Sequence, residues 1–251
     1  MFSAVINVFG HILQILYGIT EKLGVPNYGL AIIMMTVFIK IVLFPLTRKQ
    51  TVAMAKMQEI QPEVQRIQKR YKDNPQKSQE EMMKVYKEHN VNPASGCLPL
   101  LIQLPILIAL FRTLQSFFDP VRHPPFVDLD KASFLWVPNL GSPDPGFTLP
   151  IDIFHIPSIH IPYILPILVA LGTFFQQYVA MRASKSSGAP GSAQQTQKVM
   201  LYFMPLFIGY ISRTFPAGLA LYWVFYSILG IIEQLAIRSH SRVVKEEAGT
   251  K

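Results

Sequence analysis

The chain has 251 residues, of which 50% are hydrophobic and 15% are charged, and its formal net charge is +8 at pH 7. Soluble domains carry about 25% charged residues, so the composition predicts one membrane domain with a more polar insertion. The cations are spread over separate loops, and the net charge therefore does not predict specific nucleic-acid binding. Cys97 is the only cysteine, which excludes an intrachain disulfide.

Residues 1–24 are predicted to form an amphipathic helix that lies on the membrane surface. They lack the basic start and the small-residue cleavage site of a secretory signal. The face expected to be buried consists of Val5, Val8, Phe9, Leu13, Leu16 and Tyr17. The alternative is an uncleaved first membrane span, since the stretch is near the lower length limit for crossing a bilayer.

Five apolar segments are predicted to span the membrane, namely residues 28–47, 97–118, 161–181, 198–212 and 216–237. The first of them contains Lys40, about 12 Å from its inner end. A charge at that depth costs about 2.5–3.5 kcal/mol and is usually tolerated only where it faces other helices or a watery cavity. Lys40 is therefore predicted to face a hydrated cavity.

The insertion between the first two spans, residues 48–95, is predicted to be a helical hairpin. Its first helix has apolar residues at alternating steps of four and three, the seam of a two-stranded coiled coil: Ala53, Met57, Ile60, Val64, Ile67 and Tyr71. Residues 73–75 predict the turn. The second helix offers to the facing seam Met82, Val85, Tyr86 and His89. Pro62 predicts a kink or a restart of the first helix near Gln61.

Lysine and arginine are concentrated in the insertion 48–95, around the linker 183–197 and in the tail 239–251. These segments and their flanks hold 17 of the 23 lysine and arginine residues. The positive-inside rule therefore predicts an N-terminus outside the cell and a C-terminus in the cytosol. The loop 119–160 is then extracytoplasmic.

Further polar side chains fall within the predicted spans. Thr36 lies one turn before Lys40 and Thr47 two turns after it, so one face of the first span is polar. The later spans contribute Gln103, Thr173, Gln176, Gln177, Tyr202, Tyr210, Tyr222, Tyr226 and Ser227. Taken singly, each tyrosine is explained as an interfacial anchor and each glutamine as an interhelical hydrogen bond. Together with Lys40, they predict a bundle around a hydrated groove.

The sequence does not predict an enzyme. None of the six histidines falls deep in a predicted span. There is no Ser/His pair at bilayer depth, no metal-ligand spacing and no glycine-rich phosphate loop. We therefore expect no catalytic residue, no metal and no cofactor.

Four segments of the chain carry a family resemblance: NYGLAIIMMTVFIKIVLFPLTRKQ, MAKMQEIQPEVQ, VNPASGCLPLLIQLPILIALF and FPAGLALYWVFYSILGIIEQ. They resemble the YidC family of membrane protein insertases, which includes the mitochondrial oxidase-assembly and chloroplast thylakoid insertases. The resemblance runs from about residue 25 to residue 238. It implies an all-α membrane protein with five transmembrane helices around a hydrophilic groove and a cytosolic helical hairpin.

The resemblance also implies the residues of a substrate-binding groove. Lys40 matches the family's groove cation, which is usually arginine, so the charge is kept while the bidentate fork is lost. The other matches are Gln177 on the third span, Tyr222 and Trp223 on the last span and, argued partly from their depth, Thr36 and Gln103. The segment 146–164 is longer than the family pattern.

The implied function is an insertase and chaperone that works without ATP hydrolysis. It moves short hydrophilic tails of nascent membrane proteins through a groove open to the cytosol and to lipid, and releases their apolar helices into lipid. The expected partners are nascent membrane proteins and lipid, with a ribosome, a signal recognition particle receptor or the Sec translocon as further candidates. The expected location is the plasma membrane of a bacterium. Two alternatives stay open: a small-solute transporter or channel, and a non-translocating assembly clamp for membrane subunits.

Overall fold

The computed structural model describes residues 2–92, 98–119, 121, 124–125, 127–149, 159–182 and 199–249. Within these ranges the chain is mostly helical, as the sequence predicts. Cys97, the predicted linker 183–197 and residues 150–158 of the long segment 146–164 lie outside the described residues.

The described α-helices are α1 (Phe2–Lys22), α2 (Tyr28–Glu59), α3 (Gln61–Arg70), α4 (Pro75–Glu88), α5 (Leu98–Phe117), α6 (Ile164–Arg182), α8 (Met204–Ser212) and α9 (Ala217–Gly249). A π-helix, η3 (Val199–Phe203), leads into α8, and a short 3₁₀ helix, η2, covers Leu129–Ala132. Strands β1 (Phe147–Leu149) and β2 (Ile159–Ile161) pair antiparallel. This small sheet is a departure from the predicted all-α fold.

Three described stretches are long and apolar enough to cross a membrane: Tyr28–Met57, Ile164–Met181 and Ala217–Ile237. They coincide with the first, third and fifth predicted spans. The fourth predicted span corresponds to the shorter apolar stretch Val199–Ser212, and the second corresponds to the 20-residue helix α5. The protein is therefore a helical membrane protein, and the count of five spans stays a prediction.

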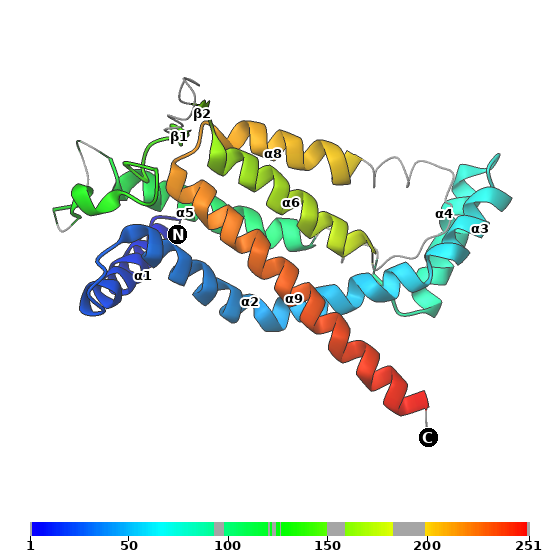
Figure 1. The fold of residues 1–251 in the computed structure, drawn as a ribbon. Coiled ribbons are helices and arrows are strands. Elements are labelled where there is room, and N and C mark those ends of the chain that lie inside the picture. Colours follow the sequence, from blue (N-terminus) through cyan, green and yellow to red (C-terminus); the bar gives the residue numbers. More distant parts are fainter. Residues whose placement is uncertain are drawn as a thin grey trace.

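Helix α2 continues from the first predicted span to Glu59 and contains Pro45 in its interior. Helix α3 begins at Gln61, because Pro62 in its first turn has no N–H with which to continue the preceding helix. Helices α3 and α4 pack together through Ile60, Val64 and Val85, at the opposite end of the molecule from α1 (Figure 1). Ala53 and Met57 lie on α2, before this pair begins. The contact between α3 and α4 is therefore shorter than the predicted coiled-coil seam.

Helix α1 packs against α2 and α5. Leu13 is fully buried, and Tyr17 stacks on Tyr28 with 4.1 Å between the ring centroids. Val5 and Val8, which belong to the same predicted face, are exposed. The apolar face of α1 is thus divided between the protein core and the surroundings, whereas a helix held only by the membrane surface would bury all of it in lipid.

The carboxylate of Asp144 connects the loop before α6 to that helix. It accepts hydrogen bonds from the backbone N–H of Gly146 (2.9 Å), the indole N–H of Trp136 (2.9 Å) and the backbone N–H of Leu165 (2.7 Å), in the first turn of α6. A negative charge at a helix N-terminus is stabilised by the free N–H groups there. Gly146 has a φ of +89°, and a Cβ at this position would collide with the carbonyl of Ile161. These contacts fix the β1–β2 pair against the start of α6.

The most tightly packed part of the core lies at the end of the bundle that carries α1 and the strands. Its fully buried side chains come from α2, α5 and α9 and include Ile32, Met35, Leu110, Leu114 and Leu219. A Cβ at Gly218 would lie only 3.0 Å from Ile32 Cδ1, so α9 approaches α2 closely here. This packing closes one end of the space between the helices.

Candidate substrate-binding cavity

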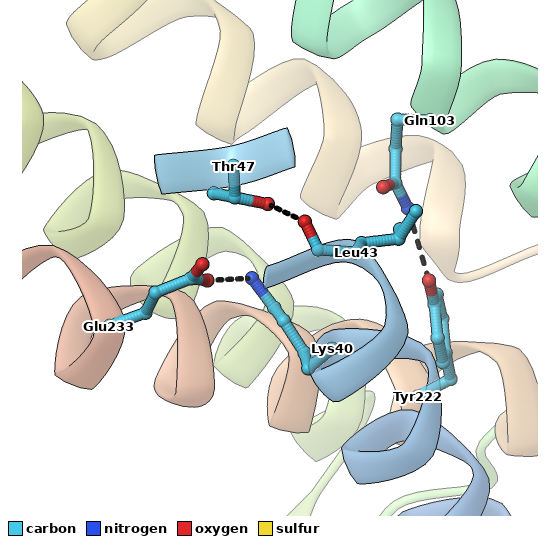
Figure 2. A network of polar contacts seen from close by, with 6 residues as sticks. All are labelled: Lys40, Leu43, Thr47, Gln103, Tyr222 and Glu233. Carbon is cyan, nitrogen blue, oxygen red and sulfur yellow. Dashed lines mark hydrogen bonds and ion pairs between the residues drawn. The ribbon is translucent and has the colours of Figure 1, made fainter. Parts of the chain in front are cut away.

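Lys40 forms an ion pair with Glu233 between α2 and α9 (Figure 2). The Lys40 Nζ lies 3.2 Å from Glu233 Oε2, and the two side chains are 10% and 8% exposed. The same ammonium lies over the ring of Tyr226, 3.9 Å from its centroid. A carboxylate and an aromatic face are the two kinds of group that stabilise a cation away from bulk water. The charge of Lys40 is therefore compensated inside the protein.

A cavity of about 120 Å³ lies beside this ion pair. More than half of its lining side chains are polar, and they come from α2, α5, α6 and α9: Lys40, Thr47, Gln50, Thr51, Gln103, Gln176, Glu233 and Gln234. The remaining lining residues are Leu43, Leu46, Met54, Tyr226 and Gly230. A polar cavity of this size accommodates several water molecules.

Two oxygens of the lining residues have no hydrogen-bond partner within the described part of the chain. They are Glu233 Oε1 and Gln234 Oε1, and both are buried. The ammonium of Lys40 has three N–H groups, of which the bond to Glu233 uses one. Because buried polar atoms are nearly always hydrogen-bonded, this arrangement suits water or a polar ligand.

The cavity follows one face of α2 toward α3. Its α2 residues recur at helical spacing from Lys40 through Thr47 and Thr51 to Met54. In the other direction, Thr36 is fully buried and its hydroxyl donates a 2.7 Å hydrogen bond to a carbonyl on its own helix. The cavity thus extends toward the α3–α4 end and meets the closely packed core at the α1 end.

Gln103 on α5 is held in the cavity wall by Tyr222 on α9. The Gln103 Nε2 donates to the Tyr222 hydroxyl at 3.1 Å (Figure 2). The Tyr222 ring centroid lies 5.6 Å from that of Tyr226. Gly230 leaves room for Gln176 and for the ion pair, because a Cβ there would collide with Gln176 Nε2 and lie 3.2 Å from Lys40 Nζ. The cavity wall is therefore shaped by the held position of Gln103 and by the absence of a side chain at Gly230.

Two of the six predicted groove residues, Lys40 and Gln103, line the cavity. Tyr222 is 1% exposed and contacts the lining through Gln103. Thr36 lies one turn beyond the closed end and outside the lining. The structure therefore brings three of these residues together and separates Thr36 from them by packing.

The other two predicted residues, Gln177 and Trp223, also lie outside the lining. On α6 it is Gln176 that faces the cavity, and Trp223 is partly buried against the hydrophobic core. Adjacent helical positions point about 100° apart, so the sequence could not decide between the two glutamines. Glu233 was missed, although it is the only carboxylate within the predicted spans. Intramembrane charges commonly pair with one another, and this signal could have identified it.

Comparison with known proteins places this chain in a family. The sequence model of the family described as 60Kd inner membrane protein matches residues 19–245. The chain is 38% identical over 233 residues to the membrane protein insertase YidC of Clostridium perfringens, covering 90% of this chain and 87% of that protein. It is 40% identical over 225 residues to the protein of the same name from Oceanobacillus iheyensis, covering 87% and 78%.

Other relatives are longer than this chain. The membrane protein insertase YidC of Treponema denticola is 38% identical over 238 residues, covering 92% of this chain but 36% of that protein. A crystal structure described as an active YidC insertase with its first transmembrane domain resolved has a similar fold. The TM-score is 0.62 at 24% identity, over 92% of this chain and 46% of the other. The match to the family over nearly the whole chain and the relatives at 38–40% identity show that the chain belongs to the YidC family.

Proposed function

We propose that this protein is a membrane protein insertase that moves short hydrophilic tails of nascent membrane proteins across the bilayer and releases their apolar helices into lipid. The observation that carries the proposal is the polar cavity at Lys40, which is lined by four helices of a protein whose relatives are named insertases. The mechanism uses no catalytic residue, cofactor or ATP hydrolysis.

Five helical segments cross the membrane in this proposal: α2, α5, α6, η3 with α8, and α9. The N-terminus is outside and the C-terminus is in the cytosol, because the basic α3–α4 pair then lies on the cytosolic side. The direction of the cavity supports this orientation, since it extends toward the α3–α4 end, from which a nascent chain would arrive. The proposed location is the plasma membrane of a bacterium.

The cavity lowers the cost of moving a hydrophilic tail. Each unsatisfied backbone group in hydrocarbon costs several kcal/mol, and polar side chains or water in the cavity satisfy such groups. Lys40 lies about 18 Å from the start of α2, so a tail that reaches it has only part of the ~30 Å hydrocarbon layer left to cross. Burial of the client's apolar segment in lipid, worth about 25 cal/mol per Å², drives the step.

The contact residues in this proposal are Lys40 and Gln103, with Tyr222 orienting Gln103. Exposed apolar side chains on α6 and α8 offer a surface along which the client's apolar helix can reach lipid: Ile167, Leu171, Phe175, Leu206 and Tyr210. The α3–α4 pair is the proposed contact for a ribosome, a signal recognition particle receptor or the Sec translocon.

The direct test is insertion into vesicles that contain only this purified protein. A single-span client with a short epitope-tagged tail is added, and protection of the tag from external protease measures translocation. We expect protection with this protein and none with empty vesicles. Uptake of a small solute without tail protection would support a transporter, and crosslinking to finished subunits alone would support an assembly clamp.

Two adjacent glutamines provide a matched test of the cavity. A photo-crosslinking amino acid is placed at Gln176, which lines the cavity, or at Gln177, which does not. The hydrophilic tail of a client caught during insertion should crosslink mainly from position 176. A stronger tail crosslink from position 177 would instead support the groove position inferred from the family resemblance.

A further inference from the structure

We propose that Glu233 is an internal counter-ion that competes with client side chains for Lys40 and so balances the cavity between acidic and basic tails. The inference rests on the proposed insertase function and adds to it a residue that determines selectivity. It begins from the ion pair between α2 and α9, which joins residues 193 positions apart.

Glu233 occupies the position that a client carboxylate would need. Its Oε2 lies 3.2 Å from Lys40 Nζ, while the ring of Tyr226 covers another side of the ammonium. A client carboxylate can form a charge-assisted hydrogen bond with Lys40 only on the remaining side, close to the negative charge of Glu233. The ion pair therefore weakens the attraction of Lys40 for acidic tails.

Glu233 also presents a charge of the opposite sign to the cavity. Its second oxygen, Oε1, is buried and has no hydrogen-bond partner in the described part of the chain, and the same holds for Oε1 of Gln234. Both residues line the cavity. Oxygens that lack donors are suitable partners for the lysine or arginine of a client tail. The cavity thus offers a cation and an anion next to each other.

The formal charges of the lining residues cancel, because Lys40 and Glu233 are the only ionised groups among them. The opposite charges of a close pair largely offset each other at a distance, so an approaching tail feels a weaker attraction than a lone lysine would exert. We therefore expect the natural protein to insert acidic and basic tails with similar efficiency.

The test compares the insertion of clients that differ only in whether the tail carries two aspartates, two serines or two lysines. The measured quantity is the ratio of acidic-tail to basic-tail protection in vesicles of one preparation, so differences in the amount of folded protein cancel. Glu233→Gln should raise this ratio by about fivefold, the change that ~1 kcal/mol produces. Lys40→Met should lower this ratio. The double variant Lys40→Met/Glu233→Gln should return the ratio to near the natural value.

The control is Glu21→Gln on α1, which removes one exposed carboxylate from a helix that contributes no residue to the cavity lining. The ratio should not change in this variant. If neither Glu233→Gln nor Lys40→Met changes the ratio while the natural protein still inserts all three clients, the inference is wrong and the insertase function stands. If the natural protein protects none of the three tails, the proposed function itself is wrong.

Discussion

Replacing Lys40 with methionine should destabilise the protein by about 3 kcal/mol, because the change leaves a buried carboxylate without its counter-ion. Glu233 is 8% exposed, and its Oε2 bonds to Lys40. Breaking a buried ion pair from one side costs about 3–5 kcal/mol, and the adjacent polar cavity puts this pair at the lower end. For a chain of this length the melting temperature should then fall by about 6–12 °C.

The double variant Lys40→Met/Glu233→Met is the matched control. Replacing both members of a buried ion pair by apolar residues is often neutral or stabilising by about 1–4 kcal/mol. The double variant should therefore melt near the temperature of the natural protein and recover most of the loss of the single variant. Melting is followed in detergent by the fluorescence of the two tryptophans, Trp136 and Trp223.

The natural protein, the two single variants and the double variant form a double-mutant cycle, and one outcome of this cycle would refute the reasoning. If the double variant loses as much stability as the two single variants together, the two charges are not coupled and the reasoning fails. The cycle also determines how insertion by a Lys40 variant is interpreted. A variant that leaves Glu233 unpaired loses folded-state stability as well as a client-binding charge, and comparison with the double variant separates these two effects.

Three further predictions concern other parts of the molecule. Asp144→Ala should lower the free energy of unfolding by about 2–4 kcal/mol, because two buried backbone donors and the half-buried indole of Trp136 lose their acceptor. Thermal melting measures the change, and an unchanged melting temperature would contradict this. Gly230→Leu should reduce tail protection while the protein still melts cooperatively, because the new side chain displaces the flexible end of Gln176 and enters the cavity beside Lys40. Full insertion by this variant would show that clients do not use the cavity. Val64→Ala should destabilise the α3–α4 contact by about 1–3 kcal/mol and should speed hydrogen exchange in α3 and α4 but not in α6. Equal acceleration in the α3–α4 pair and in α6 would show that these two parts unfold together.

The sequence predicted the burial of Lys40 because the cost of a charge depends mainly on its depth in an apolar run, which can be counted. It did not predict the partner of Lys40, because pairing depends on which helices are neighbours and at what height. Glu233 lies on the last span, and the periodicity of either helix gives no information about their relative position. Lys40, which the sequence predicts to be the groove cation, is thus also one member of an ion pair.

The polar face predicted on the first span is only partly a cavity wall. Thr47 lines the cavity, whereas Thr36 satisfies its hydroxyl on the carbonyl of Ile32 and is surrounded by the core. A threonine can bond within its own helix, so its presence in an apolar segment does not require water nearby. Helix spacing alone could not separate these two cases.

The position of Pro45 inside α2 has a mechanical consequence. This helix is about 48 Å long, and Pro45 within it lacks the N–H of a regular helical hydrogen bond, so the helix bends most easily at this point. Lys40 lies in its middle, and the α3–α4 pair is attached at its far end. A partner that binds α3 and α4 therefore holds the part of α2 beyond Pro45, and a small tilt imposed there moves Thr47 and Thr51 relative to Lys40 without any contact between that partner and the cavity.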